Sequence, residues 1–215
     1  TPFVKVGNTE ALGAEVVLHG ETLSESQSRA EEIAARRDLV FVHPYDDPHV
    51  IAGQGTVALE VLQDHDDLDI LVIPIGGGGL ASGMSVAARA IKPDIALIGV
   101  EAELFPSMYN RLKGTDLPCA GDTLAEGIAV KEPGAFTSKV LADQLDDLVL
   151  VSEGQMESAL ALLVQIEKTV VEGAGAAGLE RPHVLADVER VADHFAVLHE
   201  GVLRVNGRAD DVKAR

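Results

Sequence analysis

The stretch with the clearest chemical meaning is the run of glycines from Gly76 to Gly79 in "LVIPIGGGGLASGMS". Glycine lets the backbone turn sharply after a buried strand and leaves several N–H groups facing a cavity. The helix expected after the turn adds its own free N–H groups and the positive end of its dipole, so the natural ligand is a phosphate. The spacing matches neither G-x-x-x-x-G-K-[ST] nor G-x-G-x-x-G. It favours a phosphorylated cofactor, with a tight turn that binds nothing as the alternative.

Apolar runs alternate with helical patterns on both sides of this turn. The runs that read as strands span 14–20, 39–45, 68–75, 95–102 and 146–152. The expected helices span 22–37, 50–64, 80–92, 104–114, 134–141 and 153–168, and 169–179 reads as a strand, a turn and the start of a helix. Such alternation predicts an α/β fold, a three-layer parallel sheet with helices on both faces.

Composition narrows the class of protein. The 215 residues are 47% apolar and 3% aromatic, which fits a core of small aliphatic side chains. The net charge of −18 argues against nucleic acid as a partner, although acidity also suits a protein of high-salt surroundings. The single cysteine, Cys119, allows no internal disulfide, and no apolar run is long enough to span a membrane. We expect a cytoplasmic protein.

Five segments, taken together and in order, resemble the threonine dehydratase and serine racemase group of pyridoxal-phosphate (PLP) enzymes. They are "FVHPYDDPHVIAGQGTVALEVL", "VIPIGGGGLASG", "IGVEAELFPSM", "AEGIAVKEPG" and "VVEGAGAAGL", within residues 1–179. The resemblance implies a tryptophan-synthase-like PLP fold of type II and β-elimination from threonine or serine. It also implies a small amino-acid substrate and a homo-oligomer.

The resemblance assigns roles to residues within those motifs. Gly76, Gly77, Gly78, Gly79 and Leu80 would hold the PLP phosphate, Glu126 and Gly127 would lie beside the ring, and Glu172 would flank the pocket. Glu101 matches a carboxylate that binds a divalent cation in racemase-like members, but the acidic partner expected a few residues later is replaced in "LFPSM". Taken alone, Glu126 could instead be a helix-start carboxylate and Glu172 a loop acid. His43, His49 and His65 have neither metal-ligand nor triad spacing.

The family's Schiff-base lysine motif, of S-x-K-x-R-G-A type, does not occur in the chain, nor does the S-x-G-N-H loop that follows it. The catalytic residue is therefore unknown. We expect residues 1–179 to be an N-terminally truncated PLP-enzyme catalytic domain.

Residues 180–215 depart from this family. They resemble the segment just after the switch histidine of ABC-transporter ATPases, with His183 in its place, then a helix "VLADVERVAD" and a hairpin of "FAVLHEG" and "VLRVNG". The ATPase's phosphate loop, signature motif and Walker-B acid are absent, so this tail is expected to be structural. A join of two coding fragments near 178–180 is the simplest account.

Three functions stay open on the sequence. The first is a truncated or chimaeric relative of threonine and serine ammonia-lyases, weakly active or inactive as given, with threonine against serine and lyase against racemase undecided. The second is a hydrolase in an exposed pocket, with Ser82, Ser85 or Cys119 as nucleophile, although no G-x-S-x-G elbow supports it. The third is a non-catalytic, oligomerising protein.

Overall fold

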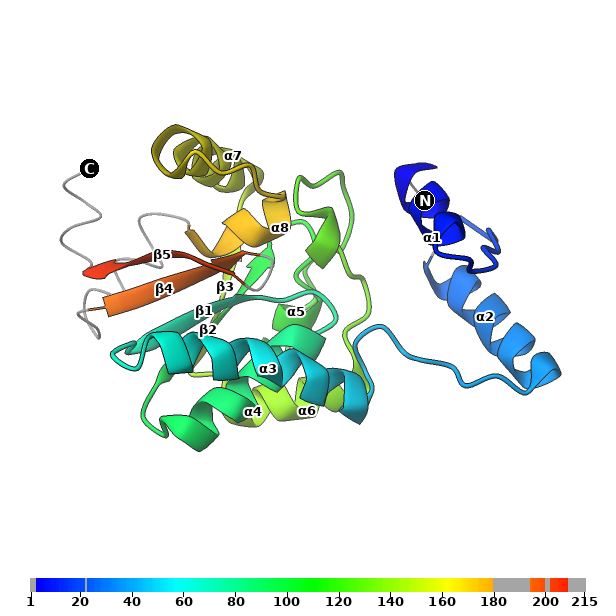
Figure 1. Ribbon diagram of the computed structural model, residues 1–215, viewed down its shortest axis with the longest axis horizontal. Helices are drawn as coiled ribbons and strands as arrows, with labels where there is room; N and C mark the ends of the chain where they lie inside the picture. Colours follow the sequence, from blue (N-terminus) through cyan, green and yellow to red (C-terminus); the bar gives the residue numbers. More distant parts are fainter. Residues whose placement is uncertain (1–2, 22, 180–193, 200–201, 209–215) are drawn as a thin grey trace. The chain divides into compact units, whose positions relative to one another are not determined.

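The structure is a computed structural model that describes residues 3–21, 23–179, 194–199 and 202–208 (Figure 1). The chain divides into two units, Thr1–Val42 and His43–Arg215. In the described ranges, no helix combines the length and the apolar character that a bilayer crossing requires.

The first unit contains two helices, α1 (Phe3–Ala11) and α2 (Leu23–Arg37). The helix expected at 22–37 is confirmed by α2, whereas α1 has no counterpart among the expected elements. Neither helix buries a side chain within this unit.

Two of the expected strands, at 14–20 and 39–45, are wrong. The backbone at these positions pairs with no other strand in the described part of the chain. The side chains of Val17, Leu18 and Val40 are exposed. Apolar and β-branched residues favour a strand only where a neighbour completes the hydrogen-bond ladder and a core covers one face.

The second unit is built on one sheet. Its strands are β1 (Ile70–Pro74), β2 (Ala96–Ala102), β3 (Asp147–Val151), β4 (His194–His199) and β5 (Val202–Arg208). Their order is β3-β2-β1-β4-β5, in which β4 and β5 pair antiparallel and all other neighbours pair parallel. The expected α/β class is confirmed, and so is a hairpin within 180–215. The helix expected at 184–193 lies outside the described residues, as does His183.

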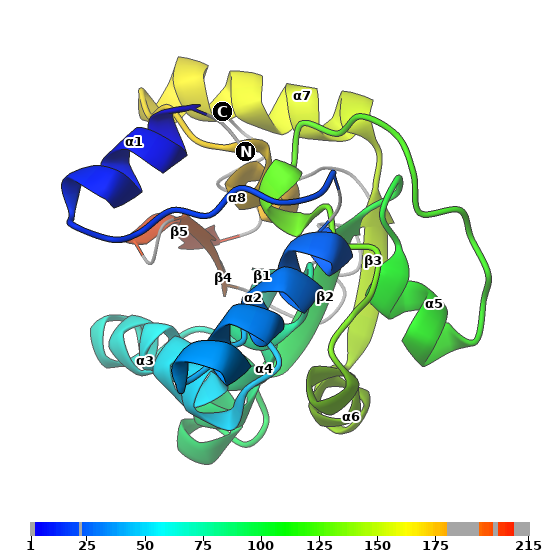
Figure 2. The ribbon, with the colours of Figure 1, turned by 90° about the vertical axis from the view of Figure 1, so that its right-hand side faces the viewer.

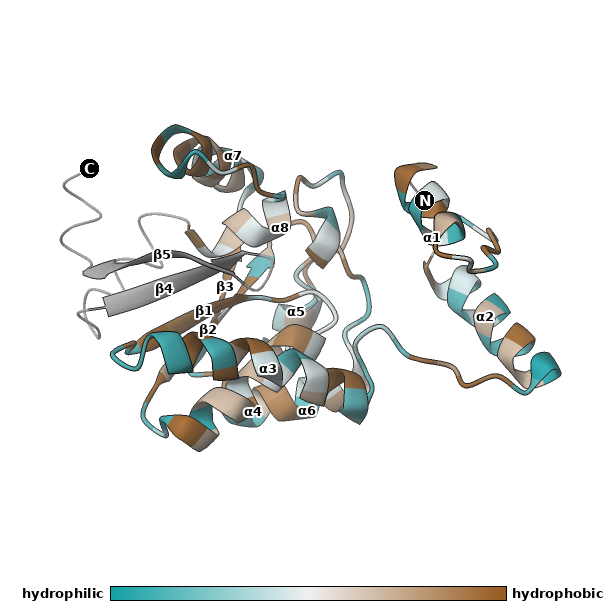
Figure 3. Ribbon diagram, in the orientation of Figure 1, coloured by the Kyte–Doolittle hydropathy of each residue, from teal (hydrophilic) through white to brown (hydrophobic). Residues whose placement is uncertain are grey.

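Helices cover both faces of this sheet, as expected (Figure 2). Leu71 and Ile73 of β1 pack into a core with α3 (Pro48–Asp64), α4 (Gly79–Ile91), α5 (Ser107–Lys113) and α6 (Ala135–Gln144). Ile70 and Val72 point to the opposite face, toward α7 (Glu153–Leu162) and the 3₁₀ turn Ala177–Leu179. Strands buried on both faces are apolar throughout, which Figure 3 shows as brown for β1.

The elements expected at 153–168 and 169–179 form only in part. The helix expected at 153–168 starts with a capping box, in which Ser152 and Gln155 exchange hydrogen bonds, and ends as α-helix at Leu162. A π-helical turn follows over Leu163–Glu167. The strand expected after it does not form: Val170 is 86% exposed, and the next element is the short α8 (Gly173–Ala176).

Helices α3 and α4 cross at two glycines. A Cβ atom on Gly83 would overlap the carbonyl oxygen of Ile51 and lie 2.6 Å from the backbone nitrogen of Gly55, and a Cβ on Gly55 would lie 3.0 Å from the carbonyl oxygen of Gly83. The two backbones therefore touch, and neither position has room for a side chain.

This crossing predicts opposite effects for two glycine substitutions. Gly83→Ala should lower the free energy of unfolding by about 3 kcal/mol or more, because backbone atoms and not flexible side chains oppose the new methyl group. Gly53→Ala, in α3 with no atom within 4 Å of the added Cβ, should raise it by about 0.5–1 kcal/mol through helix propensity. Urea unfolding measures both, and equal effects of the two variants would contradict the close crossing.

Candidate functional site

The glycine turn joins the carboxyl end of β1 to the first residue of α4. Gly78 is the N-cap of α4 and has φ of +95°, a left-handed conformation that side chains rarely adopt. The N–H groups of Gly76, Gly77 and Gly78 donate to no other residue in the described part of the chain. Three adjacent donors at the positive end of a helix form an anion-binding arrangement.

A cavity of about 690 Å³ lies beside this turn and brings most of the predicted cofactor residues together. Gly76–Leu80, Gly127 and Glu172 all line it. Glu126 is exposed at the start of the 3₁₀ helix Glu126–Ile128, next to Gly127, and is not among the lining residues. The described lining residues include no lysine, so the structure offers no amine for covalent attachment of an aldehyde here.

Tyr45 is a lining residue that the sequence reasoning missed. A Cβ on Gly77 would overlap its ring carbons, so the ring packs directly on the turn. Its hydroxyl donates to the carbonyl oxygen of Glu132 at 3.0 Å. Burial, followed by the charges of Asp46 and Glu132, raises the pKa of the Tyr45 phenol. An aromatic residue directly before two aspartates in "HPYDDP" was the available signal.

Glu101, the expected cation ligand, binds backbone N–H groups at the start of α5 in the structure. Its side chain is fully buried, and its two carboxylate oxygens accept the N–H groups of Met108 and Tyr109 at 2.8 and 2.7 Å, which caps α5. Within the described residues no group of three or more His, Cys, Asp or Glu side chains could hold a metal ion. Burial raises the pKa of Glu101 to about 7, against the lowering effect of the two backbone hydrogen bonds.

The two serines offered as nucleophiles are packed into the protein. Ser82 and Ser85 are both fully buried, and their hydroxyls donate to the carbonyl oxygens of Thr137 and Ser82 at 3.4 and 3.1 Å. A buried hydroxyl that donates to the backbone is not available to attack a substrate.

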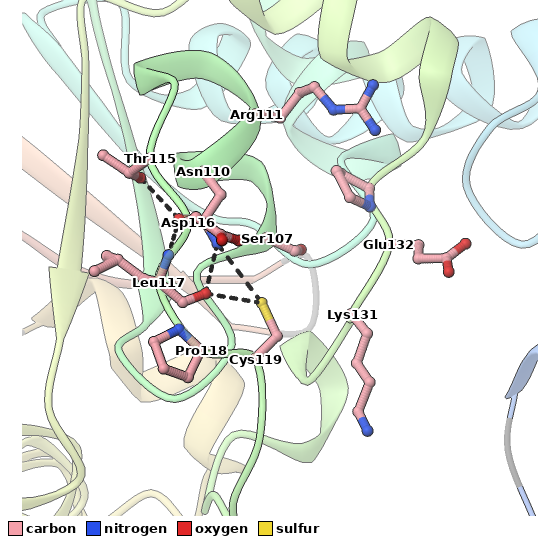
Figure 4. Close-up of a pocket in the computed structure, with 11 residues that line it drawn as sticks. Ser107, Asn110, Arg111, Thr115, Asp116, Leu117, Pro118, Cys119, Lys131 and Glu132 are labelled. Carbon is pink, nitrogen blue, oxygen red and sulfur yellow. Dashed lines mark hydrogen bonds between the residues drawn. The ribbon is translucent and has the colours of Figure 1, made fainter.

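Cys119 lies in a different cavity, of about 670 Å³, at the loop after α5 (Figure 4). Asn110 organises this loop: its amide donates to the carbonyl oxygen of Leu117 and accepts from the Leu117 N–H and the Thr115 hydroxyl. Figure 4 shows Arg111, Lys131 and Glu132 pointing in different directions, so their charges do not converge on one ligand. Burial, followed by the charges of Glu101 and Asp116, raises the pKa of the Cys119 thiol and makes it a poor nucleophile.

The chain is similar to known proteins over most of its length. The family model described as pyridoxal-phosphate dependent enzyme matches residues 1–199. The L-threonine ammonia-lyase of Thermotoga maritima is 44% identical over 180 residues, which cover 83% of this chain and 45% of that protein. The match to the family extends past residue 179 and includes β4.

Two solved structures show the same architecture. The processed form of threonine deaminase isoform 2 from Solanum lycopersicum is 34% identical, with a TM-score of 0.76 over 83% of this chain and 50% of that one. Maize serine racemase is 29% identical, with a TM-score of 0.75 over 81% of this chain and 55% of that one. The chain spans about half the length of the curated relatives that it matches.

The buried carboxyl of Glu101 predicts a particular dependence of stability on pH. Its pKa is raised from 4.5 to about 7 in the folded state, so between these values the folded state keeps a proton that the unfolded state has released. This group therefore stabilises the fold at low pH, and its contribution falls by about 3 kcal/mol as the pH rises from 4.5 to 7.

Urea unfolding of the wild type and of Glu101→Gln across this range measures the effect. The variant is expected to gain on the wild type by about that amount as the pH rises, whatever its stability at the start. Glu103→Gln, an exposed site on the same segment, is the control. A difference between E101Q and wild type that stays constant with pH would contradict the prediction.

Proposed function

The chain belongs to the family of pyridoxal-phosphate dependent enzymes, and from that premise we propose that it carries the phosphate-binding part of an enzyme that removes ammonia from L-threonine or L-serine. The observation that carries the proposal is that the N–H groups of Gly76–Gly78 have no partner among the described residues, while these glycines line one cavity with Gly127 and Glu172. The names of the relatives, threonine ammonia-lyase, threonine deaminase and serine racemase, supply the substrate class.

In this proposal each side of the cavity has one role. Gly76–Leu80 bind the phosphate of PLP through backbone N–H groups, and the α4 dipole adds attraction for its charge. Gly127 leaves room beside the ring, and Glu172 supplies a carboxylate at the pocket's edge, with Glu126 next to Gly127 on the exposed side. When bound, PLP supplies an electron-poor ring that stabilises negative charge at the substrate's α-carbon.

The chain has the phosphate cradle, and none of the described residues that line this cavity is a lysine. We therefore propose that it binds PLP weakly and turns over hydroxy amino acids little or not at all. The base that removes the α-proton is unassigned. A homo-oligomer in the cytoplasm and a divalent cation at Glu101 remain predictions, the cation without support from the geometry around that carboxylate.

The division at 179 also remains a proposal. In favour of a structural role for the tail, β4 pairs parallel with β1 and so extends the sheet formed by β1, β2 and β3. An origin in an ABC-transporter ATPase rests on the sequence resemblance alone. Sequencing reads across codons 170–190 of the source DNA test it, because an uninterrupted PLP-enzyme reading frame would remove the need for a join.

Ser82 and Ser85 are buried and hydrogen-bonded to the backbone, which argues against a hydrolase that uses either serine as its nucleophile. A fluorophosphonate probe should leave the protein unlabelled, which would leave a non-catalytic, oligomerising protein as the remaining alternative to the lyase.

The phosphate cradle predicts how ligands will bind. Pyridoxine 5′-phosphate should bind more tightly than pyridoxine in equilibrium dialysis; both lack the aldehyde that would react with surface lysines. Gly78→Ala should weaken the phosphorylated ligand by about tenfold or more, since a residue at φ of +95° is strained and its Cβ would meet Met108 and Thr137. Gly53→Ala is the matched glycine control.

Turnover is tested with PLP and L-threonine or L-serine, by the appearance of the 2-oxo acid. The rate is expected not to exceed that of PLP alone. Equal affinity for both pyridoxine forms would refute the cradle, and rapid 2-oxo acid formation would refute the proposed inactivity.

A further inference from the structure

Two adjacent aspartates cap two different helices of the second unit. Asp47 is the N-cap of α3, and its carboxylate accepts the N–H groups of His49 and Val50 at 2.8 and 3.2 Å. The carboxylate of Asp46 instead reaches across the fold to the start of α6. It accepts the N–H groups of Ala135, Phe136 and Thr137 at 3.0, 2.9 and 2.9 Å.

The first turn of α6, in turn, holds the glycine turn. The hydroxyl of Thr137 donates to the carbonyl oxygen of Gly77 at 2.7 Å, and the N–H of Gly134 donates to the same oxygen at 3.2 Å. Thr137 is fully buried, so no water competes for this carbonyl. Asp46 thus fixes the N-terminus of α6, and α6 fixes one peptide group of the turn.

The geometry of that peptide group decides where its N–H points. In a trans peptide the C=O of Gly77 and the N–H of Gly78 point in opposite directions. No residue of Gly134–Ser138 lines the glycine-turn cavity, so the Gly77 carbonyl points away from the cavity toward α6. The Gly78 N–H, which donates to no other described residue, is thereby directed to the cavity side.

We propose that Asp46 and Thr137 are positioning residues that set the Gly77–Gly78 peptide for phosphate binding. The proposal rests on the proposed function for its ligand, but the hydrogen bond to the Gly77 carbonyl can be observed without any ligand. Asp46 also accepts the N–H groups of Ala135, Phe136 and Thr137, so the first turn of α6 does not offer them to a ligand.

Isotope labelling can isolate this peptide in the full chain. Residues 76–79 contain the only Gly-Gly pairs among the 21 glycines of the sequence. In protein made with glycine carrying ¹³C at the carbonyl and ¹⁵N, an HNCO experiment therefore selects the amides of Gly77, Gly78 and Gly79. The Gly78 amide correlates with the carbonyl carbon of Gly77, the acceptor in question.

In ligand-free protein, Thr137→Val removes the hydroxyl at nearly constant volume and is expected to move the Gly77 carbonyl signal, whereas Thr137→Ser should keep it near the wild-type position. Asp46→Ala should move it as well, because the start of α6 loses its acceptor. Asp47→Ala is the matched control that caps only α3. An unmoved signal in both T137V and D46A overturns the proposal.

Binding gives the second readout. T137V and D46A should weaken pyridoxine 5′-phosphate by about threefold to tenfold, the value of one buried hydrogen bond, with pyridoxine unaffected. T137S and Asp47→Ala should bind as the wild type does. If the wild type prefers pyridoxine 5′-phosphate to pyridoxine, an unchanged affinity of the T137V variant for the phosphorylated ligand overturns the positioning role.

The two proposals fail in distinguishable ways. If the wild type does not prefer the phosphorylated ligand, the proposed function is refuted, and so is the expected effect of Asp46 and Thr137 on phosphate affinity. The NMR signal of the Gly77 carbonyl in ligand-free protein still tests the hydrogen bond from Thr137. Rescue by T137S separates positioning from a loss of folding, because both Thr137 variants alter the same buried site and only one keeps the hydroxyl.

Discussion

The second unit depends on the burial of β1 on both faces and both edges. The strand pairs with β2 on one edge and with β4 on the other, and its side chains alternate between two cores. The first four residues of β1 are buried, Pro74 at the carboxyl end is partly exposed, and the cavity begins at this end of the strand. The glycine turn stands at the carboxyl end, where parallel α/β sheets place their ligands.

Long-range capping holds the elements around that end together. The carboxylate of Asp46 bonds to residues 89 to 91 positions further along the chain, and Glu101 bonds to the start of α5 from within β2. Each is an acid at a helix N-terminus, where the dipole and free N–H groups stabilise negative charge. The carboxylate of Glu101 is also fully buried, and this burial raises its pKa.

The sequence predicts the parts of this fold whose signals are local. The buried strands 68–75 and 95–102 and the helices that follow them were identified because hydrophobic runs and helical periodicity coincide with burial there. The strands at 14–20 and 39–45 failed because their apolar residues have neither a pairing strand nor a covering core in the described structure. Asp46 and Thr137 carry no local signal in the sequence, because the hydrogen bonds between Asp46 and α6 and between Thr137 and Gly77 span 60 to 91 positions.

The run of four glycines is compatible both with a phosphate site and with a tight turn that binds nothing, so the sequence alone does not distinguish the two. A Cβ at Gly77 or Gly79 would meet Tyr45, one at Gly78 would meet Met108 and Thr137, and one at Gly76 would lie 3.0 Å from the backbone of Ile128. The protein's own packing therefore excludes a side chain at Gly77 and Gly78 and leaves little room at Gly76 and Gly79, with or without a ligand. A phosphate site and a simple tight turn differ in whether the N–H groups have hydrogen-bond partners. A turn built only for packing would pair them internally, because an unpaired buried N–H is costly. Here the carbonyl of Gly77 is bonded twice, while the N–H groups of Gly76–Gly78 have no partner among the described residues and line a cavity. That asymmetry, and not the number of glycines, is the physical argument for an anion.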